Sequence, residues 1–222
     1  MKNRKVQVWL WLVASFTFIA LALFLSAGTL NYWRAWVYLC VGAVSSVPLT
    51  LYIVSDPILL ENRTKATAEQ RPIQKIIVLC TGFAGIAAFI VPGLDHRFGW
   101  SRMPTWLSLA GNLLILLSMW MGYRVFKENY FASATIEISS DQKVISTGPY
   151  AVVRNPMYSS AALYFIGMSL ALGSYWGLIP SVLTIVGLVV RLLDEEKFLA
   201  KNLPGYTEYR ARVRSHLIPG IF

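Results

Sequence analysis

The sequence predicts an all-α integral membrane protein with about six transmembrane helices, the last two of which form a short helical hairpin. Hydrophobic residues make up 56% of the 222 residues and charged residues only 14%, whereas soluble domains carry about a quarter charged residues. Uncharged apolar stretches also recur along the chain, at 6–31, 35–55, 76–94, 103–123 and 157–190. The first four have roughly the length that is needed to cross the hydrocarbon core of a bilayer.

The fifth apolar stretch is too long for one transmembrane helix. Its 34 residues would extend about 50 Å as a helix, whereas the hydrocarbon core is about 30 Å thick. The sequence GSYWG at 173–177 interrupts it with turn formers and interfacial aromatic residues. We therefore expect a hairpin whose two ends return to the same side of the membrane, and the sequence leaves open whether this hairpin crosses the bilayer fully.

The distribution of basic residues predicts the orientation in the membrane. If the amino-terminal tail is cytoplasmic, seventeen of the twenty lysines and arginines lie on the cytoplasmic side, as the positive-inside tendency requires. Both termini are then cytoplasmic. The net charge of +9 comes from residues beside hydrophobic ends rather than from a separate basic domain, which favours anionic membrane lipids over nucleic acid as partners.

The chain divides into an amino-terminal transmembrane part, 1–123, and a carboxyl-terminal part, 124–222, where the polar motifs gather. In the first part we expect a polar connection at 56–75 and an outer loop at 92–104. Cys40 and Cys80 both lie in apolar stretches without metal-ligand or redox spacing, so no disulfide or metal site is expected.

The segment GPYAVVRNPMYSS, residues 148–160, is a rigid polar hinge before the hairpin. Gly148-Pro149 favours a turn, and Pro156 biases the preceding residue away from helical geometry, so a helix is predicted to begin at Pro156 or Met157. Its free N–H groups would point to the cytoplasmic interface, where they suit an anionic or polar ligand group. Residues 134–147 alternate β-branched and polar side chains, which is typical of short extended segments.

A second polar motif, RLLDEE, begins at Arg191 where the last apolar helix emerges. Arg191 and Glu195 share one helix face, whereas Glu196 is rotated by about 100°. An interfacial salt bridge and a functional site are both compatible with this spacing. Leu203-Pro204-Gly205 should end the helix, and the basic, aromatic segment 206–214 is suited to lying on lipid headgroups.

These motifs, GPYAVVRNPMY, a hairpin, RLLDEE, LPGYTEYRARV and LIPGIF, resemble the isoprenylcysteine carboxyl methyltransferase family, which is related to the membrane phospholipid N-methyltransferases. The resemblance covers about residues 126–222. It implies S-adenosylmethionine-dependent methyl transfer in a cytoplasmic pocket, without a metal. The GLDHRFGW segment at 93–100 is similar to that of prokaryotic relatives, which implies a prokaryotic cell membrane.

The resemblance also implies roles for individual residues. Arg154, Arg191 and Glu195 would be catalytic, with Arg191 meeting the substrate. The cofactor would contact residues of the hinge, of the preceding segment and of the acidic motif: Gln142, Lys143, Val144, Ile145, Tyr150, Asn155, Pro156, Met157, Tyr158, Glu195 and Glu196. Aromatic faces favour a sulfonium cation, and carboxylates accept hydrogen bonds from an amine or ribose.

Two positions depart from the family pattern. Asn155 stands where the family usually has histidine, and Ser160 stands where a glycine is common. Because asparagine does not titrate near neutral pH, it cannot accept the proton of an amine substrate. A carboxylate acceptor needs no base, since it is already ionised at pH 7. We therefore expect methylation of a carboxylate on a lipophilic, isoprenoid-like small molecule that enters from the bilayer.

Two other functions are compatible with the motifs. A membrane reductase of the sterol reductase type has a similar R-x-P-x-Y hinge but uses NADPH, whose 2′-phosphate would call for more cationic contacts than this chain offers. The chain could also be a non-catalytic membrane relative in which Asn155 and Ser160 mark lost activity. The sequence identifies neither the methyl acceptor nor the oligomeric state.

Overall fold

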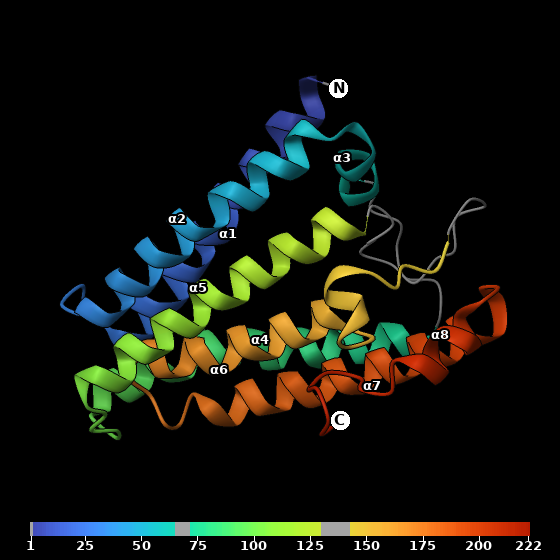
Figure 1. The fold of residues 1–222 in the computed structure, drawn as a ribbon. Coiled ribbons are helices and arrows are strands. Elements are labelled where there is room, and N and C mark those ends of the chain that lie inside the picture. The colour runs from blue at the N-terminus through green and yellow to red at the C-terminus, as the bar shows by residue number, and fades with distance from the viewer. Residues whose placement is uncertain (1, 65–71, 130–142) are drawn as a thin grey trace.

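The computed structural model of the protein describes residues 2–64, 72–129 and 143–222, which form eight α-helices and one 3-10 helix and contain no strand (Figure 1). The predicted all-α class is confirmed for these residues. In chain order the elements are α1 (Lys2–Ala27), α2 (Trp33–Ser55), α3 (Pro57–Thr64), α4 (Pro72–Phe98), α5 (Thr105–Glu128), η1 (Gly148–Ala151), α6 (Pro156–Ala171), α7 (Leu178–Asn202) and α8 (Tyr206–Arg212).

Four of the helices, α1, α2, α4 and α5, are long and apolar enough to cross a membrane. They correspond to the first four predicted spans. The expectation of about six such helices is too high for the described residues, because α6 has 16 residues and is only about 24 Å long, shorter than the hydrocarbon core. Helix α7 has 25 residues but ends in the charged motif.

The predicted hairpin of α6 and α7 is present, and its turn lies at the same end of the bundle as the α1–α2 and α4–α5 turns (Figure 1). The Tyr32 hydroxyl, at the start of α2, donates a hydrogen bond to the Leu172 carbonyl at 2.6 Å. The Ser174 hydroxyl donates to the buried carboxylate of Asp95 at 2.5 Å. The hairpin therefore extends along the bundle to the turns of the four long helices.

Two connections differ from the sequence prediction. Residues 92–104 were expected to be a loop, but α4 continues through Pro92 to Phe98, because membrane helices tolerate proline where neighbouring groups satisfy the freed backbone. Helix α4 ends beside Gly99, whose φ of 66° is left-handed. The polar connection at 56–75 contains α3, where the Asp56 carboxylate accepts a hydrogen bond from the Leu59 N–H at 3.1 Å, as a helix cap does.

Helices α5 and α6 pack with their backbones very close together. A Cβ atom at Gly111 would lie 2.3 Å from the Ala171 nitrogen and 2.6 Å from the Gly167 carbonyl oxygen. At the last residue of the hinge segment, Ser160 and Ser118 each donate a hydrogen bond to the other's carbonyl oxygen at 2.8 Å. Small residues and hydroxyl groups of this kind hold membrane helices together. Ser160 thus joins α6 to α5 instead of facing α7.

This contact predicts that Gly111→Ala destabilises the protein. The added methyl group meets backbone atoms of α6 that cannot rotate away, and overpacking of this kind typically costs about 1–3 kcal/mol. We expect a lower unfolding midpoint when the purified protein is heated in detergent and tryptophan fluorescence is recorded. Gly82→Ala in α4 is the matched control, because no atom lies within 4 Å of its added Cβ. An equal midpoint for both variants would contradict the close α5–α6 contact.

Candidate active site

The hinge before α6 is held in place by the end of α5. Gly148 opens the 3-10 helix η1 with a φ of 55°, and a Cβ atom there would lie 2.8 Å from a carboxylate oxygen of Glu128. The same carboxylate accepts a hydrogen bond from the Thr147 hydroxyl. Only glycine combines this backbone angle with this close approach. Helix α6 then begins at Pro156, as the sequence predicts.

The carboxyl-terminal segment 213–222, which we call the C-terminal strap, binds along the hinge. The N–H groups of Arg154 and Asn155 donate to the carbonyl oxygens of Ser215 and His216 at 2.9 and 3.0 Å. The Ser159 hydroxyl donates to the Leu217 carbonyl at 2.7 Å. Backbone groups of the hinge that no helix satisfies thus find partners about 60 residues away in sequence.

A buried ion pair joins the hinge to α7. The Arg154 guanidinium donates to the Glu196 carboxylate through Nε at 2.9 Å and through Nη2 at 3.2 Å, and both side chains are 4% exposed. Its Nη1 group donates to the carbonyl oxygens of Val213 and Arg214 at 2.9 and 2.8 Å. Such a bidentate geometry, with further carbonyl partners, offsets the large cost of removing two charges from water.

Two further side chains complete this buried polar cluster, which consists of Arg154, Asn155, Glu196 and His216. The Asn155 amide donates to the Glu196 carboxylate at 2.5 Å. The His216 ring nitrogen Nδ1 lies 3.1 Å from the same carboxylate oxygen. Glu196 is therefore surrounded by groups of the hinge and the C-terminal strap. Sequence reasoning missed His216, because only the folded strap brings position 216 to the hinge.

The neighbouring carboxylate of Glu195 makes a different contact. The Tyr158 hydroxyl donates to Glu195 Oε2 at 2.6 Å, and the Arg191 side chain lies near the same hydroxyl. Arg191 and Glu195 lie one turn apart on α7, while Glu196 is directed to the buried polar cluster. The hinge and the acidic motif thus meet through Tyr158 and Glu195, and the two adjacent glutamates make separate contacts.

Aromatic residues of α8 cover the start of the hinge. Tyr206 and Tyr209 are buried against Val144 and Tyr150, and the Tyr209 hydroxyl donates to the Tyr150 carbonyl at 2.8 Å. Burial raises the pKa of Tyr206 and Tyr209 well above the ordinary value near 10, so both phenols are neutral at physiological pH. Helix α7 ends before Leu203-Pro204-Gly205, as predicted, and Gly205 has a φ of 82°.

The remaining predicted site residues lie around these contacts. Gln142 falls outside the described residues. Lys143, Val144 and Ile145 precede η1 without regular structure. Met157 packs against Leu59 of α3 and Phe126 of α5. The structure thus gathers Arg191, Tyr158 and Glu195 in one group, and Arg154, Asn155 and Glu196 in another.

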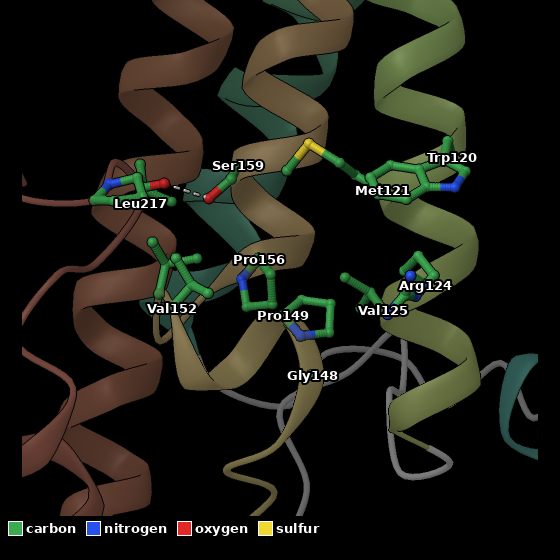
Figure 2. A pocket seen from close by; sticks show the side chains of 12 residues that line it. Trp120, Met121, Arg124, Val125, Gly148, Pro149, Val152, Pro156, Ser159 and Leu217 are labelled. Carbon is green, nitrogen blue, oxygen red and sulfur yellow. Dashed lines mark hydrogen bonds between the residues drawn. The ribbon is translucent and has the colours of Figure 1, made fainter.

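A cavity of ≈ 380 Å³ lies between the end of α5, the hinge, the start of α6 and the C-terminal strap (Figure 2). Of the predicted cofactor residues, Pro156 lines it. The side chain of Tyr158 instead bonds to α7, and the helical rotation between positions 156 and 158 is about 200°. The cavity and the Tyr158–Glu195 contact therefore lie on different faces of α6.

Comparison with known proteins links the site to membrane methyltransferases. Residues 106–204 match the family model described as phospholipid methyltransferase. Phosphatidylethanolamine N-methyltransferases of Saccharomyces cerevisiae strains YJM789 and RM11-1a are 30% and 28% identical over 92 residues. This match covers 40% of the chain but only 11% of the relatives' length. The matched family segment contains the hinge, α6 and α7 up to its end.

A solved structure shares the fold. The eukaryotic intramembrane Ras methyltransferase, isoprenylcysteine carboxyl methyltransferase, aligns with a TM-score of 0.50 and 18% identity, over 95% of this chain and 85% of that chain. The resemblance to membrane methyltransferases predicted from the motifs is confirmed, as is the multi-pass membrane architecture. Both methyltransferase families use S-adenosylmethionine.

The buried ion pair predicts that Glu196→Ala strongly destabilises the fold. Removing one partner of a buried pair typically costs about 3–5 kcal/mol, because the other charge is left uncompensated. The neighbouring Glu195 is only partly buried and accepts a hydrogen bond from Tyr158, so Glu195→Ala should cost less, about 1.5–3 kcal/mol. Thermal unfolding of both variants in the same detergent measures the difference. Equal losses would show that Arg154 and Glu196 do not hold the hinge.

Proposed function

We propose that this chain is an integral membrane methyltransferase that transfers the methyl group of S-adenosylmethionine to a lipophilic acceptor. The observation that carries this proposal is the meeting of the hinge and the acidic end of α7, through Tyr158 and Glu195, inside the segment that matches phospholipid methyltransferases. The same segment contains the residues that the family resemblance marks as functional. We assign the catalytic region to residues 124–222 and the membrane anchor to 1–123.

The residues around this contact fit the proposed cofactor. When bound, S-adenosylmethionine supplies an electrophilic methyl group on a sulfonium cation. The carboxylate of Glu195 can accept hydrogen bonds from the amine or ribose hydroxyls, and the phenol rings of Tyr150 and Tyr158 favour a nearby cation. The segment before the hinge offers backbone groups at Lys143, Val144 and Ile145. Glu195 and Tyr158 would hold and orient the donor.

Arg191 and Arg154 have different tasks in this proposal. Arg191 lies beside Tyr158 and Glu195, where its guanidinium can orient an acceptor carboxylate by paired hydrogen bonds. Arg154 acts at a distance from the acceptor: it is engaged by Glu196 and by carbonyl oxygens of the strap, so it positions the hinge. The rate enhancement would come from alignment of the reacting atoms and from exclusion of water.

A carboxylate on an isoprenoid-like molecule is the acceptor that we favour. Such an acceptor needs no general base, and Asn155 cannot act as one. An amine acceptor is the second candidate, and His216 supports it. The ring of His216 lies 3.1 Å from the Glu196 carboxylate, so the region holds an imidazole even though position 155 lacks one. The identity of the curated relatives as N-methyltransferases also favours this candidate.

We further propose that both termini are cytoplasmic, that the hairpin inserts into the bilayer with both of its ends on the cytoplasmic side and that the protein resides in a prokaryotic cell membrane. Seventeen of the twenty basic residues then lie on the cytoplasmic side. The α6–α7 turn lies with Trp100 and Trp176, whose rings are 6.2 Å apart, and interfacial tryptophans mark the opposite membrane surface. The lipophilic acceptor would enter laterally from the bilayer, and the cofactor would enter from the cytoplasm.

The proposed cofactor site predicts that Glu195→Gln weakens S-adenosylmethionine binding about tenfold or more. A hydrogen bond to a charged group contributes about 1.5–3 kcal/mol, and about 1.4 kcal/mol corresponds to tenfold in affinity. Calorimetric titration of the purified protein measures the change. Glu208→Gln in the exposed part of α8 is the control and should bind like the unaltered protein. Saturable binding of NADPH without binding of S-adenosylmethionine would instead support the reductase.

The class of acceptor predicts the chemical stability of the product. With membrane lipid extract and S-adenosylmethionine labelled in its methyl group, a methylated carboxylate should release labelled methanol in mild base. A methylated amine keeps its label under the same treatment. We expect base-labile product, and we expect His216→Gln to leave the pH profile of its formation unchanged. Base-stable product whose formation loses its pH dependence in His216→Gln would favour the amine acceptor, and absence of any transfer would favour a non-catalytic relative.

A further inference from the structure

The cavity between α5, the hinge, α6 and the C-terminal strap, which we call the hinge cavity, has an apolar floor and an exposed rim. Its floor is formed by four buried residues, Val125, Val153, Pro156 and Leu217, which come from α5, the hinge, α6 and the C-terminal strap. Its rim is formed by exposed residues, Trp120, Arg124, Val152 and Pro219. The volume of ≈ 380 Å³ lies within the range of small-molecule sites. Figure 2 shows the α5 side chains on one wall and the hinge prolines opposite them.

The floor offers little hydrogen bonding to an occupant. Ser159 is the hydroxyl residue of the lining, and its hydroxyl already donates to the Leu217 carbonyl at 2.7 Å (Figure 2). The other floor side chains are hydrocarbon. Burying an acyl or other hydrocarbon chain there would be favourable, whereas burying a polar group would leave it without a partner.

One charged side chain stands at the rim. Arg124 is exposed on α5, and its guanidinium carbon lies 5.5 Å from the centre of the Trp120 ring, one helical turn earlier. Among residues 2–64, 72–129 and 143–222, no carboxylate lies within ion-pair distance of Arg124. A permanently charged, planar guanidinium suits the bidentate binding of a phosphate group.

The position of the cavity indicates where its occupant comes from. Trp120 is 56% exposed and lies with Arg124 near the hinge end of α5, in the pattern of tryptophan and arginine at a membrane interface. The cavity also lies on a different face of α6 from the Tyr158–Glu195 contact. An occupant that enters past Trp120 would therefore come from the bilayer and would be separate from the proposed methyl acceptor.

We propose that the hinge cavity binds a glycerophospholipid of the bilayer, with one acyl chain on the floor and its phosphate on Arg124. Because the floor includes Val153 and Pro156, which flank Arg154 and Asn155, the bound chain packs directly against the hinge that carries the buried polar cluster. This site is defined by its own residues and does not depend on whether the protein transfers methyl groups.

Photo-crosslinking tests this site directly. The protein in detergent micelles is illuminated with phosphatidylglycerol that carries a diazirine on one acyl chain, and labelled peptides are mapped by mass spectrometry. We expect labelling of the lining of α5 and of the hinge, Trp120 to Val125 and Pro149 to Val153. Diacylglycerol with the same diazirine chain lacks the phosphate, and it should label these peptides about tenfold less, the effect expected for loss of one charge-assisted hydrogen bond.

Three variants make the test specific. Arg124→Gln should reduce labelling by phosphatidylglycerol to the level of diacylglycerol, and Val152→Trp at the exposed rim should reduce labelling by both lipids by filling the entrance. Lys127→Gln, an exposed cation at the same end of α5 outside the lining, should label like the unaltered protein. Equal labelling by the two lipids, equal loss in Arg124→Gln and Lys127→Gln, or labelling spread over α1 and α4 would each overturn the proposal.

Two measurements keep a folding defect or a failed function from being mistaken for loss of the site. Each variant must elute as a single peak in size-exclusion chromatography and unfold at the midpoint of the unaltered protein. The crosslinking is carried out without S-adenosylmethionine. A protein that labels as expected but does not bind S-adenosylmethionine would retain the lipid site and refute the methyltransferase.

Discussion

The buried ion pair between Arg154 and Glu196 is the interaction on which the arrangement of the hinge depends. Both side chains are 4% exposed. Two charges buried away from water are stable only when a close ion pair and further hydrogen bonds compensate the cost of their desolvation. The compensation comes from three separate parts of the chain: the hinge, the end of α7 and the C-terminal strap. Loss of any one part would leave a charged group buried without its partners.

The position of the Tyr158–Glu195 contact follows from that of the Arg154–Glu196 ion pair. Because Glu195 precedes Glu196 on α7, fixing Glu196 against Arg154 directs Glu195 to another side of the helix, where it meets Tyr158 at 2.6 Å. Glu196 thus stabilises the hinge, whereas Glu195 bonds to Tyr158. The close approach of α5 and α6 at Gly111 and Ser160 holds the opposite face of α6, so the hinge is fixed from both sides.

Much of this arrangement could be predicted from the sequence, because the signals are local. Hydrophobic length identifies the four long helices, Pro156 marks the start of α6, and Leu203-Pro204-Gly205 marks the end of α7. The spacing of Arg191, Glu195 and Glu196 predicts that the two glutamates diverge. The prediction of a loop at 92–104 was wrong because proline ends a helix in water more reliably than it does inside a bundle of membrane helices.

Two other contacts between distant segments could not be predicted. Nothing near His216 in the sequence indicates that its ring lies beside Glu196, and nothing near Ser160 indicates that it bonds to Ser118. The interpretation of Ser160 as a sign of lost activity therefore has a structural alternative, since this serine joins two helices. The cavity beside Arg124 is equally hidden, because its walls come from α5, the hinge, α6 and the strap.

Hydrogen–deuterium exchange with and without S-adenosylmethionine tests most directly whether the hinge and the end of α7 together form the donor site. We expect the cofactor to slow exchange in two segments that are distant in sequence, 143–158 and 191–209, and to leave the rest of the chain unchanged. Protection that appears in one of these segments alone, in α1 or α2, or nowhere at saturating cofactor would contradict this expectation.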